Sequence, residues 1–193
     1  LAFNFAVPIL DKDNFIKELF VHESLLNQDT KLIPNPVVIM AGGQGKRLRP
    51  LTQNCPKPMI KVNGKPILEI LLRKLSDIGF RNFYLSINYL KEQIIDYFGD
   101  GSSMGININY LIEKKSLGTA GSLTLLPENI NSQLIVMNAD VLTNFNAIHL
   151  LNFHTRYKAD ATLSVHRSDF EVPYGVVKAK GIDLVEFQEK PVY

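Results

Sequence analysis

Hydrophobic residues recur along residues 37–193 in two alternating patterns, and these patterns predict the secondary structure. Short runs rich in β-branched and aromatic residues predict strands, at Val37–Met40, Asn82–Ile87, Ile106–Leu111, Leu134–Asn138 and Ala161–His166. Apolar residues at helical spacing predict helices, from Pro66 to Gly79 and at Lys91–Phe98, Thr119–Leu126 and Asn146–Lys158. Strands that alternate with helices predict an α/β fold, in which helices cover both faces of a mostly parallel sheet.

Residues 1–35 follow a different pattern. Two apolar runs, Val7–Leu10 and Phe15–Phe20, flank a polar turn at Asp11–Asn14, which predicts a β-hairpin. A hairpin of this size cannot bury a core by itself. We therefore expect residues 1–35 to be a linker or the tail of a preceding domain, and residues 36–193 to be the main domain. The missing initiator Met also suggests a piece excised from a longer polypeptide.

Composition excludes several classes of protein. The chain is 46% hydrophobic and 21% charged, and it has no apolar run of the roughly 18 residues that a membrane span needs. We therefore do not expect a membrane protein. The net charge is only +2 and no Lys/Arg tract is present, so nucleic acid is not an expected partner. The single cysteine, Cys55, cannot form an internal disulfide, which favours the reducing cytoplasm.

A glycine-rich segment, Ala41–Thr52, directly follows the first predicted strand of the main domain. Its glycines allow a sharp turn that presents backbone N–H groups to an anion: Gly42, Gly43 and Gly45. Leu48 stands where a dinucleotide-binding motif has its third glycine, and Arg47 stands where a Walker loop has Ser or Thr. A phosphate-binding loop and an ordinary strand-to-helix turn both fit the pattern.

Two further positions suggest phosphate and metal chemistry. Lys57 lies between two prolines, which would hold it in a fixed loop where it could neutralise phosphate, although such a segment is often a plain surface turn. Asp140 follows a predicted strand and should lie at the carboxyl edge of the sheet, where ligands of such sheets bind. Its carboxylate could hold Mg²⁺ or could cap a helix.

Five motifs in order resemble one known family. The glycine segment resembles GGxGxRLxPLT followed by PKPM, and four shorter motifs come after it: LGTAGSL (Leu117–Leu123), NAD (Asn138–Asp140), VPYGVV (Val172–Val177) and EKP (Glu189–Pro191). Together they resemble the sugar nucleotidyltransferases, in particular the mannose-1-phosphate guanylyltransferase-like branch. The resemblance runs from Val37 to Tyr193. It implies a three-layer Rossmann-like fold of the nucleotide-diphospho-sugar transferase type, incomplete at its C-terminus.

The resemblance implies an enzyme that joins a nucleoside triphosphate to a sugar 1-phosphate and releases pyrophosphate, with Mg²⁺ as cofactor. It leaves open whether the protein forms a homo-oligomer. The implied catalytic residues are Arg47, Lys57 and Asp140, with Asp140 also the metal ligand. The implied nucleotide-binding residues are Ala41, Gly42, Gly43, Gly45, Glu113, Gly118 and Thr119. The implied sugar-phosphate-binding residues are Tyr174, Gly175, Glu189 and Lys190. Alternatively, Tyr174 could belong to the core, and Glu189–Lys190 could be a solvated turn.

Glu113 suggests the nucleobase. It ends the predicted strand before LGTAG, where uridine- and thymidine-using relatives commonly have glutamine. A carboxylate only accepts hydrogen bonds, which suits the two adjacent donors of guanine and opposes the carbonyls of uracil and thymine. We therefore expect GTP to be preferred. In the alternative interpretations, Glu113 pairs with Lys114 or Lys115 in solvent, or the enzyme uses UTP or dTTP.

Two features keep a different class of function open. Lys46 replaces the small hydroxyl residue usual in the family, and residues 7–20 resemble the closing strands of a cystathionine-β-synthase-type (CBS) domain, a ligand-sensing module. Both would fit a regulatory protein that senses nucleotide sugars without turnover. The resemblance also implies a second metal-binding aspartate beyond Tyr193, so we expect the 193 residues alone to be weakly active or inactive.

Overall fold

The structure is a computed structural model that describes residues 6–13, 15–21, 32–115, 117–118, 120–143 and 145–193. The chain divides into two units, Leu1–Asn144 and Phe145–Tyr193, and each is described by itself.

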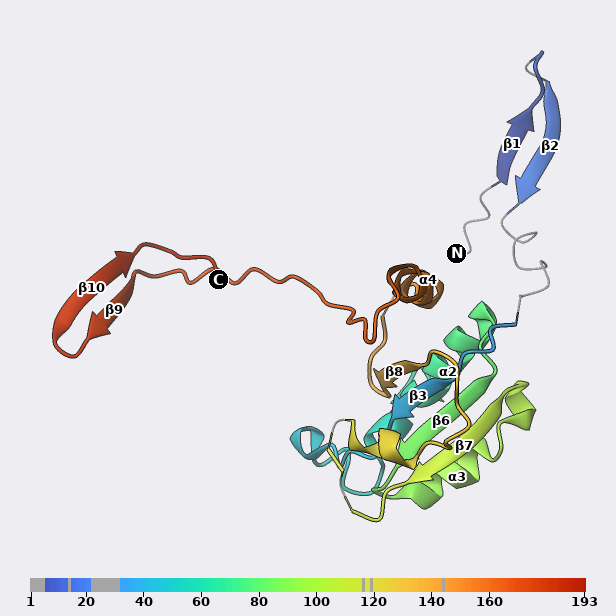
Figure 1. Ribbon diagram of the computed structural model, residues 1–193, viewed down its shortest axis with the longest axis horizontal. Helices are drawn as coiled ribbons and strands as arrows, with labels where there is room; N and C mark the ends of the chain where they lie inside the picture. Colours follow the sequence, from blue (N-terminus) through green and yellow to red (C-terminus); the bar gives the residue numbers. More distant parts are fainter. Residues whose placement is uncertain (1–5, 14, 22–31, 116, 119, 144) are drawn as a thin grey trace. The chain divides into compact units, whose positions relative to one another are not determined.

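A parallel sheet forms the centre of the first unit. Its strands are β3 (Val37–Met40), β6 (Asn82–Ile87), β7 (Asn107–Ile112) and β8 (Ile135–Asn138), in the order β7-β6-β3-β8 (Figure 1). All three pairings are parallel, which confirms the predicted sheet. The three apolar residues that begin β3 are fully buried. Because successive side chains of a strand point to opposite faces, both faces of β3 are covered.

Two helices of the first unit complete its core. Helix α2 (Ile67–Ile78) buries four leucines, Leu68, Leu71, Leu72 and Leu75, on one face. It ends at Gly79, whose φ of 122° is open to glycine and closed to most other residues. Helix α3 (Lys91–Phe98) buries Ile94 and Phe98 in the same way. Both helices lie where the spacing of apolar residues predicts them.

The connections contain short elements that apolar spacing does not reveal: η1 (Lys46–Leu48), η2 (Lys57–Met59), η3 (Ser102–Met104) and the hairpin β4 (Lys61–Val62) and β5 (Lys65–Pro66). The helix predicted at Thr119–Leu126 is a 3-10 helix instead, η4 (Gly121–Leu125), and Thr119 lies outside the described residues. A glycine at its first position and Pro127 shortly after its end leave too few residues for a regular α-helix.

The hairpin predicted near the N-terminus is confirmed. Strand β1 (Ala6–Leu10) pairs antiparallel with β2 (Ile16–Val21). The Asp11 carboxylate closes the turn, because it accepts hydrogen bonds from the backbone N–H groups of Asp13 (2.9 Å) and Phe15 (3.0 Å). The proposed relation to a CBS domain stays a prediction.

The second unit contains the predicted helix α4 (Ala147–Tyr157) and a hairpin that the sequence analysis missed, β9 (Val176–Lys180) and β10 (Asp183–Gln188). The Asn146 side chain caps α4 by accepting from the His149 N–H at 2.9 Å. The strand predicted at Ala161–His166 is wrong. Its apolar and polar residues alternate, but within the described chain this segment has no partner strand, and Leu163 is 82% exposed. Among the helices of the described residues, none combines the length and apolar character needed to cross a lipid bilayer.

Candidate active site

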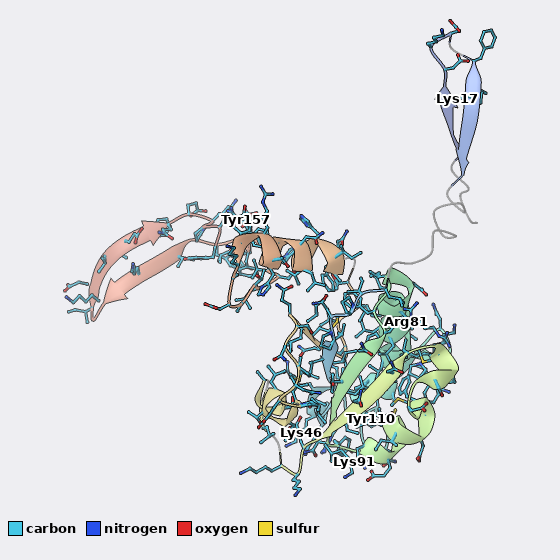
Figure 2. The ribbon with its side chains drawn as sticks, turned by 45° about the vertical axis from the view of Figure 1, so that its right-hand side comes forward. Lys17, Lys46, Arg81, Lys91, Tyr110 and Tyr157 are labelled. Atoms are coloured by element: carbon cyan, nitrogen blue, oxygen red, sulfur yellow. The ribbon has the colours of Figure 1, made fainter. Side chains whose placement is uncertain are left out.

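A cleft of about 1210 Å³ lies at the carboxyl ends of the sheet strands in the first unit. Figure 2 shows Lys46 at this end of the sheet and Arg81 at the opposite end. The cleft is lined by most of the residues that the sequence analysis assigned to phosphate, nucleotide and metal: Ala41, Gly42, Gly43, Gly45, Arg47, Lys57, Glu113, Gly118 and Asp140. The edge of the sheet thus brings together residues from four separate segments.

The glycine loop begins at the end of β3, where the Ala41 N–H donates to the Ser86 carbonyl at 2.8 Å. Gly45 adopts a left-handed conformation with φ of 60°, and its carbonyl accepts a hydrogen bond from the buried Thr52 hydroxyl at 2.8 Å. Among the described residues, no protein acceptor receives the N–H groups of residues 42–45. Unpaired amides that line a cleft form a concave donor surface suited to an anion.

Lys57 is fixed beside this loop. It begins η2, with Pro56 as the preceding cap and Pro58 buried behind it. The Tyr89 hydroxyl donates to the Gln53 carbonyl at 2.6 Å and so attaches the segment before η2 to the end of β6. A Cβ at Gly45 would lie 3.2 Å from the Lys57 Cβ, so the glycine loop and Lys57 are in direct contact.

The Lys57 ammonium forms an ion pair with the Asp140 carboxylate, from a position 83 residues away in the sequence. Their side chains are 35% and 33% exposed, so both groups remain accessible from the cleft. The alternative in which Asp140 caps a helix finds no support, because Asn146 caps the next helix. A cation and an anion therefore lie side by side at the edge of the sheet.

The Asp140 carboxylate is an oxygen ligand of the kind that hard divalent cations prefer. In the described part of the chain, no group of three or more His, Cys, Asp or Glu side chains could enclose a metal by itself. Magnesium is commonly held by one or two carboxylates together with water and substrate phosphates. An accessible carboxylate beside the glycine loop fits that mode of binding.

Glu113 follows β7 and lines the cleft, where it is half-buried. Its Oε1 accepts a hydrogen bond from the Ser86 hydroxyl at 2.5 Å, and its Oε2 accepts from the Leu117 N–H at 3.0 Å. The alternative interpretation paired this carboxylate with neighbouring lysines in solvent. The structure pairs it with Ser86 and Leu117 instead.

The residues expected at the sugar lie together in the second unit. Glu171 and Val192 form an isolated antiparallel bridge, and β9 pairs with β10 from Val176 and Gln188 onward. The two segments between these pairings therefore face each other, and they hold Tyr174, Gly175, Glu189 and Lys190. A Cβ at Gly175 would lie 3.2 Å from the Glu189 Oε2. Tyr174 is 73% exposed, so it does not belong to the core of this unit.

A known protein family matches the part of the chain that contains these residues. Residues 36–193 match the family described as Nucleotidyl transferase. The chain belongs to this family. The match covers the parallel sheet and its cleft in the first unit as well as the helix and hairpin of the second.

Members of the nucleotidyl transferase family that resemble this chain include named guanylyltransferases. Mannose-1-phosphate guanylyltransferase of Mycobacterium tuberculosis is 37% identical over 155 residues, which are 79% of this chain and 43% of that protein. D-glycero-alpha-D-manno-heptose 1-phosphate guanylyltransferase of Aneurinibacillus thermoaerophilus is 34% identical over 155 residues, which are 79% of this chain and 66% of that protein. The chain thus spans less than half the length of the first of these relatives.

Solved structures share the fold. HddC from Yersinia pseudotuberculosis, complexed with GMP-PN, is 29% identical with a TM-score of 0.56, and the match covers 81% of this chain and 69% of that one. A putative glucose-1-phosphate thymidylyltransferase from Bacillus anthracis is 20% identical with a TM-score of 0.58, and the match covers 81% and 64%. The nucleotide-diphospho-sugar transferase fold is therefore confirmed.

Sequence reasoning missed Ser86, Asn88 and Thr52, which hold the predicted residues in position. Asn88 donates from its side chain to the Glu113 carbonyl at 3.0 Å, and Ser86 and Thr52 act through their hydroxyls. One signal was available for Ser86, a lone polar residue within the apolar run of Phe83–Ile87. A fully buried hydroxyl in a strand requires a hydrogen-bond partner.

Proposed function

We propose that the protein is a sugar-1-phosphate nucleotidyltransferase that joins GTP to a sugar 1-phosphate and releases pyrophosphate. The observation that carries the proposal is the cleft itself, where the free amides of residues 42–45, Arg47, Lys57 and Asp140 line one cavity. Its cationic and amide donors match a triphosphate, and its carboxylate matches a divalent cation.

The glycine loop and Arg47 bind the phosphates that leave as pyrophosphate. An oxygen of the sugar 1-phosphate attacks the α-phosphorus in line, the bond from that phosphorus to the bridging oxygen breaks, and pyrophosphate departs. No covalent bond to the protein is needed, so positioning and charge neutralisation supply most of the rate acceleration. Arg47 and Lys57 stabilise the negative charge that grows on pyrophosphate as it leaves.

Magnesium fits this site through Asp140, and when bound it would reduce the repulsion between the α-phosphate and the incoming sugar phosphate. Asp140 would hold the cation at the carboxyl edge of the sheet. Tyr174 and Gly175 contact the sugar. Glu189 accepts a hydrogen bond from a sugar hydroxyl, and Lys190 binds the sugar phosphate. The proximity of these four residues at the open end of the β9–β10 hairpin supports their common role.

Guanine is the proposed base because Glu113 offers acceptors only. Each carboxylate oxygen already accepts one hydrogen bond and retains a second lone pair. Two adjacent acceptors match the N1–H and amino group of guanine, whereas uracil presents a carbonyl on either side of its N–H. Two of the similar proteins are named guanylyltransferases, which supports the same base.

A pyrophosphate-release assay on the full-length protein tests the proposal. GTP, UTP, dTTP and ATP are each paired with a panel of sugar 1-phosphates that includes mannose 1-phosphate. We expect the highest kcat/KM with GTP. Preference for UTP or dTTP would reject the role of Glu113, and nucleotide binding without turnover on any sugar phosphate would support a regulatory protein.

Asp140→Asn tests the metal-binding role. An amide is nearly isosteric with a carboxylate but is a poor ligand for a hard cation. The activation free energy should therefore rise by about 3 kcal/mol, and the turnover number should fall roughly a hundredfold. The circular dichroism spectrum should not change. An unaltered turnover number would reject the assignment of Asp140.

A further inference from the structure

Ser86 is the only serine or threonine of the inner strand β6, and it is completely buried. Its Oγ donates to the Glu113 Oε1 at 2.5 Å, while its backbone carbonyl accepts from the Ala41 N–H at 2.8 Å. One residue of the strand interior therefore contacts both the start of the glycine loop and the carboxylate that follows the neighbouring strand. Ser86 borders the cleft, but its side chain has no exposed surface, so we expect it to act through these partners.

The Glu113 carboxylate is held from several directions. The Leu117 N–H donates to its Oε2 at 3.0 Å, which ties the segment after β7 back to the side chain. The backbone of Gly42 also approaches closely, since a Cβ there would lie 3.1 Å from the Glu113 Oε1. Asn88 fixes the Glu113 carbonyl at 3.0 Å. These contacts leave the carboxylate little freedom to rotate.

We propose that Ser86 is a positioning residue that determines nucleotide specificity by fixing the orientation of the Glu113 carboxylate. The inference rests on the proposed function, in which Glu113 binds guanine. A carboxylate can contact two adjacent donors only while both of its oxygens face the base. Ser86 supplies the donor for one oxygen and Leu117 supplies the donor for the other, so the free lone pairs of both oxygens keep a common orientation.

Two substitutions separate the orientation of this group from its chemistry. In Ser86→Ala the carboxylate remains, but Oε1 loses its donor and only the hydrogen bond from Leu117 still orients the group. In Glu113→Gln the anchoring can persist, because a hydroxyl can accept as well as donate. The amide oxygen would accept from Leu117, and the amide nitrogen would donate to Ser86. That variant loses one of the two acceptors for guanine.

The experiment measures the binding of GTP and of UTP to the full-length protein by titration calorimetry without sugar phosphate, so that the sugar need not be known. We expect Ser86→Ala to reduce the preference for GTP over UTP by about tenfold, as expected when one of two paired contacts is lost. The double variant with Glu113→Gln should lose no more preference than Glu113→Gln alone, because Ser86 acts through Glu113. An unchanged preference in Ser86→Ala, with a reduced one in Glu113→Gln, would overturn the proposal.

A second measurement does not depend on nucleotide. Hydrogen exchange of the Leu117 amide should become faster in Ser86→Ala, and it should stay near the wild-type rate in Glu113→Gln. Exchange that is unaffected by Ser86→Ala would overturn the anchoring role. If Leu117 responds as expected but wild type binds UTP as tightly as GTP, the anchor stands and the role of Glu113 in the proposed function fails.

Discussion

At the residue scale, Gly45 shows how closely the glycine loop is packed. Its φ of 60° lies in the left-handed region, and a Cβ would lie 2.9 Å from the Thr52 Cγ2. Thr52 cannot move aside easily, because it is fully buried and its hydroxyl donates to the Gly45 carbonyl. Gly43 differs in both respects, since it has an ordinary φ and nothing lies within 4 Å of its Cβ position.

We therefore predict that Gly45→Ala lowers the free energy of unfolding by about 2 kcal/mol, from left-handed strain and the contact with Thr52. Gly43→Ala should change it by less than about 0.5 kcal/mol. Urea denaturation measures the free energy of unfolding of both variants, each of which adds one methyl group to the same loop. Equal losses of stability would show that Gly45 has no special conformational role.

The residue scale also shows what sequence can predict of the candidate site. The cleft-lining residues of the glycine loop could be predicted because one short segment supplies them. The contact between Lys57 and Asp140 could not be derived from spacing, because 83 residues separate them and only the order of the strands brings them together. Ser86 was missed because a single serine in a strand has no local pattern.

At the element scale, the helices of the first unit are joined by one buried carboxylate. Glu69 of α2 is 6% exposed and accepts from the Tyr97 hydroxyl of α3 at 2.6 Å and from the Arg73 Nε at 2.7 Å. These hydrogen bonds, with the one from Tyr97 the largest cause, hold the pKa of Glu69 below its usual value. The same bond raises the pKa of Tyr97.

This shift fixes the sign of a pH dependence. A depressed pKa means that the ionised form stabilises the fold above the ordinary pKa of glutamate, and that this stability is lost as pH falls through the lowered value. We predict that Glu69→Gln lowers the free energy of unfolding by about 1 kcal/mol near neutral pH. The difference from wild type should shrink as pH falls from neutrality through the lowered pKa of Glu69. Urea titrations across this range measure it, and a constant difference would contradict the prediction.

Elements with strong periodicity were predictable, and the exceptions have physical causes. α2 and α3 have apolar faces at regular spacing, so they occur where expected. The alternating residues of Ala161–His166 resemble a strand, but no neighbouring strand pairs with them in the described chain. The hairpin of β9 and β10 was overlooked although Gly181, with φ of 66°, marks its turn. Pairing depends on a partner, which periodicity alone does not identify.

At the scale of the whole molecule, the order of the strands determines which distant segments share one edge. β3 lies between β6 and β8, so the glycine loop, Ser86 and Asp140 emerge from three adjacent strands. Strand order could not be obtained from the sequence pattern, which predicted only a parallel sheet. The family resemblance supplied the residue roles that topology alone would have left unassigned.

If Asp140 binds the cation and Lys57 binds the nucleotide phosphates, as proposed, their ion pair makes the binding of cation and nucleotide mutually dependent. In the free protein a divalent cation must compete with the Lys57 ammonium for the same carboxylate. Nucleotide phosphates would offer Lys57 another partner and would release Asp140. Thermodynamic linkage requires the effect to be reciprocal, so each ligand should tighten the binding of the other by the same factor.

We predict that Lys57→Gln tightens the binding of Mn²⁺, used as a probe for Mg²⁺, by about tenfold in the absence of nucleotide, since removing a competing charge is worth 1 kcal/mol or more. Lys46→Gln is the matched control. It removes the same charge from the same cleft, and Lys46 forms no ion pair within the described chain. Calorimetric titrations with and without GTP measure the coupling, and equal shifts in the two variants would attribute it to net charge alone. If only Lys57→Gln tightens the binding of Mn²⁺, the ion pair makes the protein respond to the metal–nucleotide complex while it remains nearly indifferent to free metal.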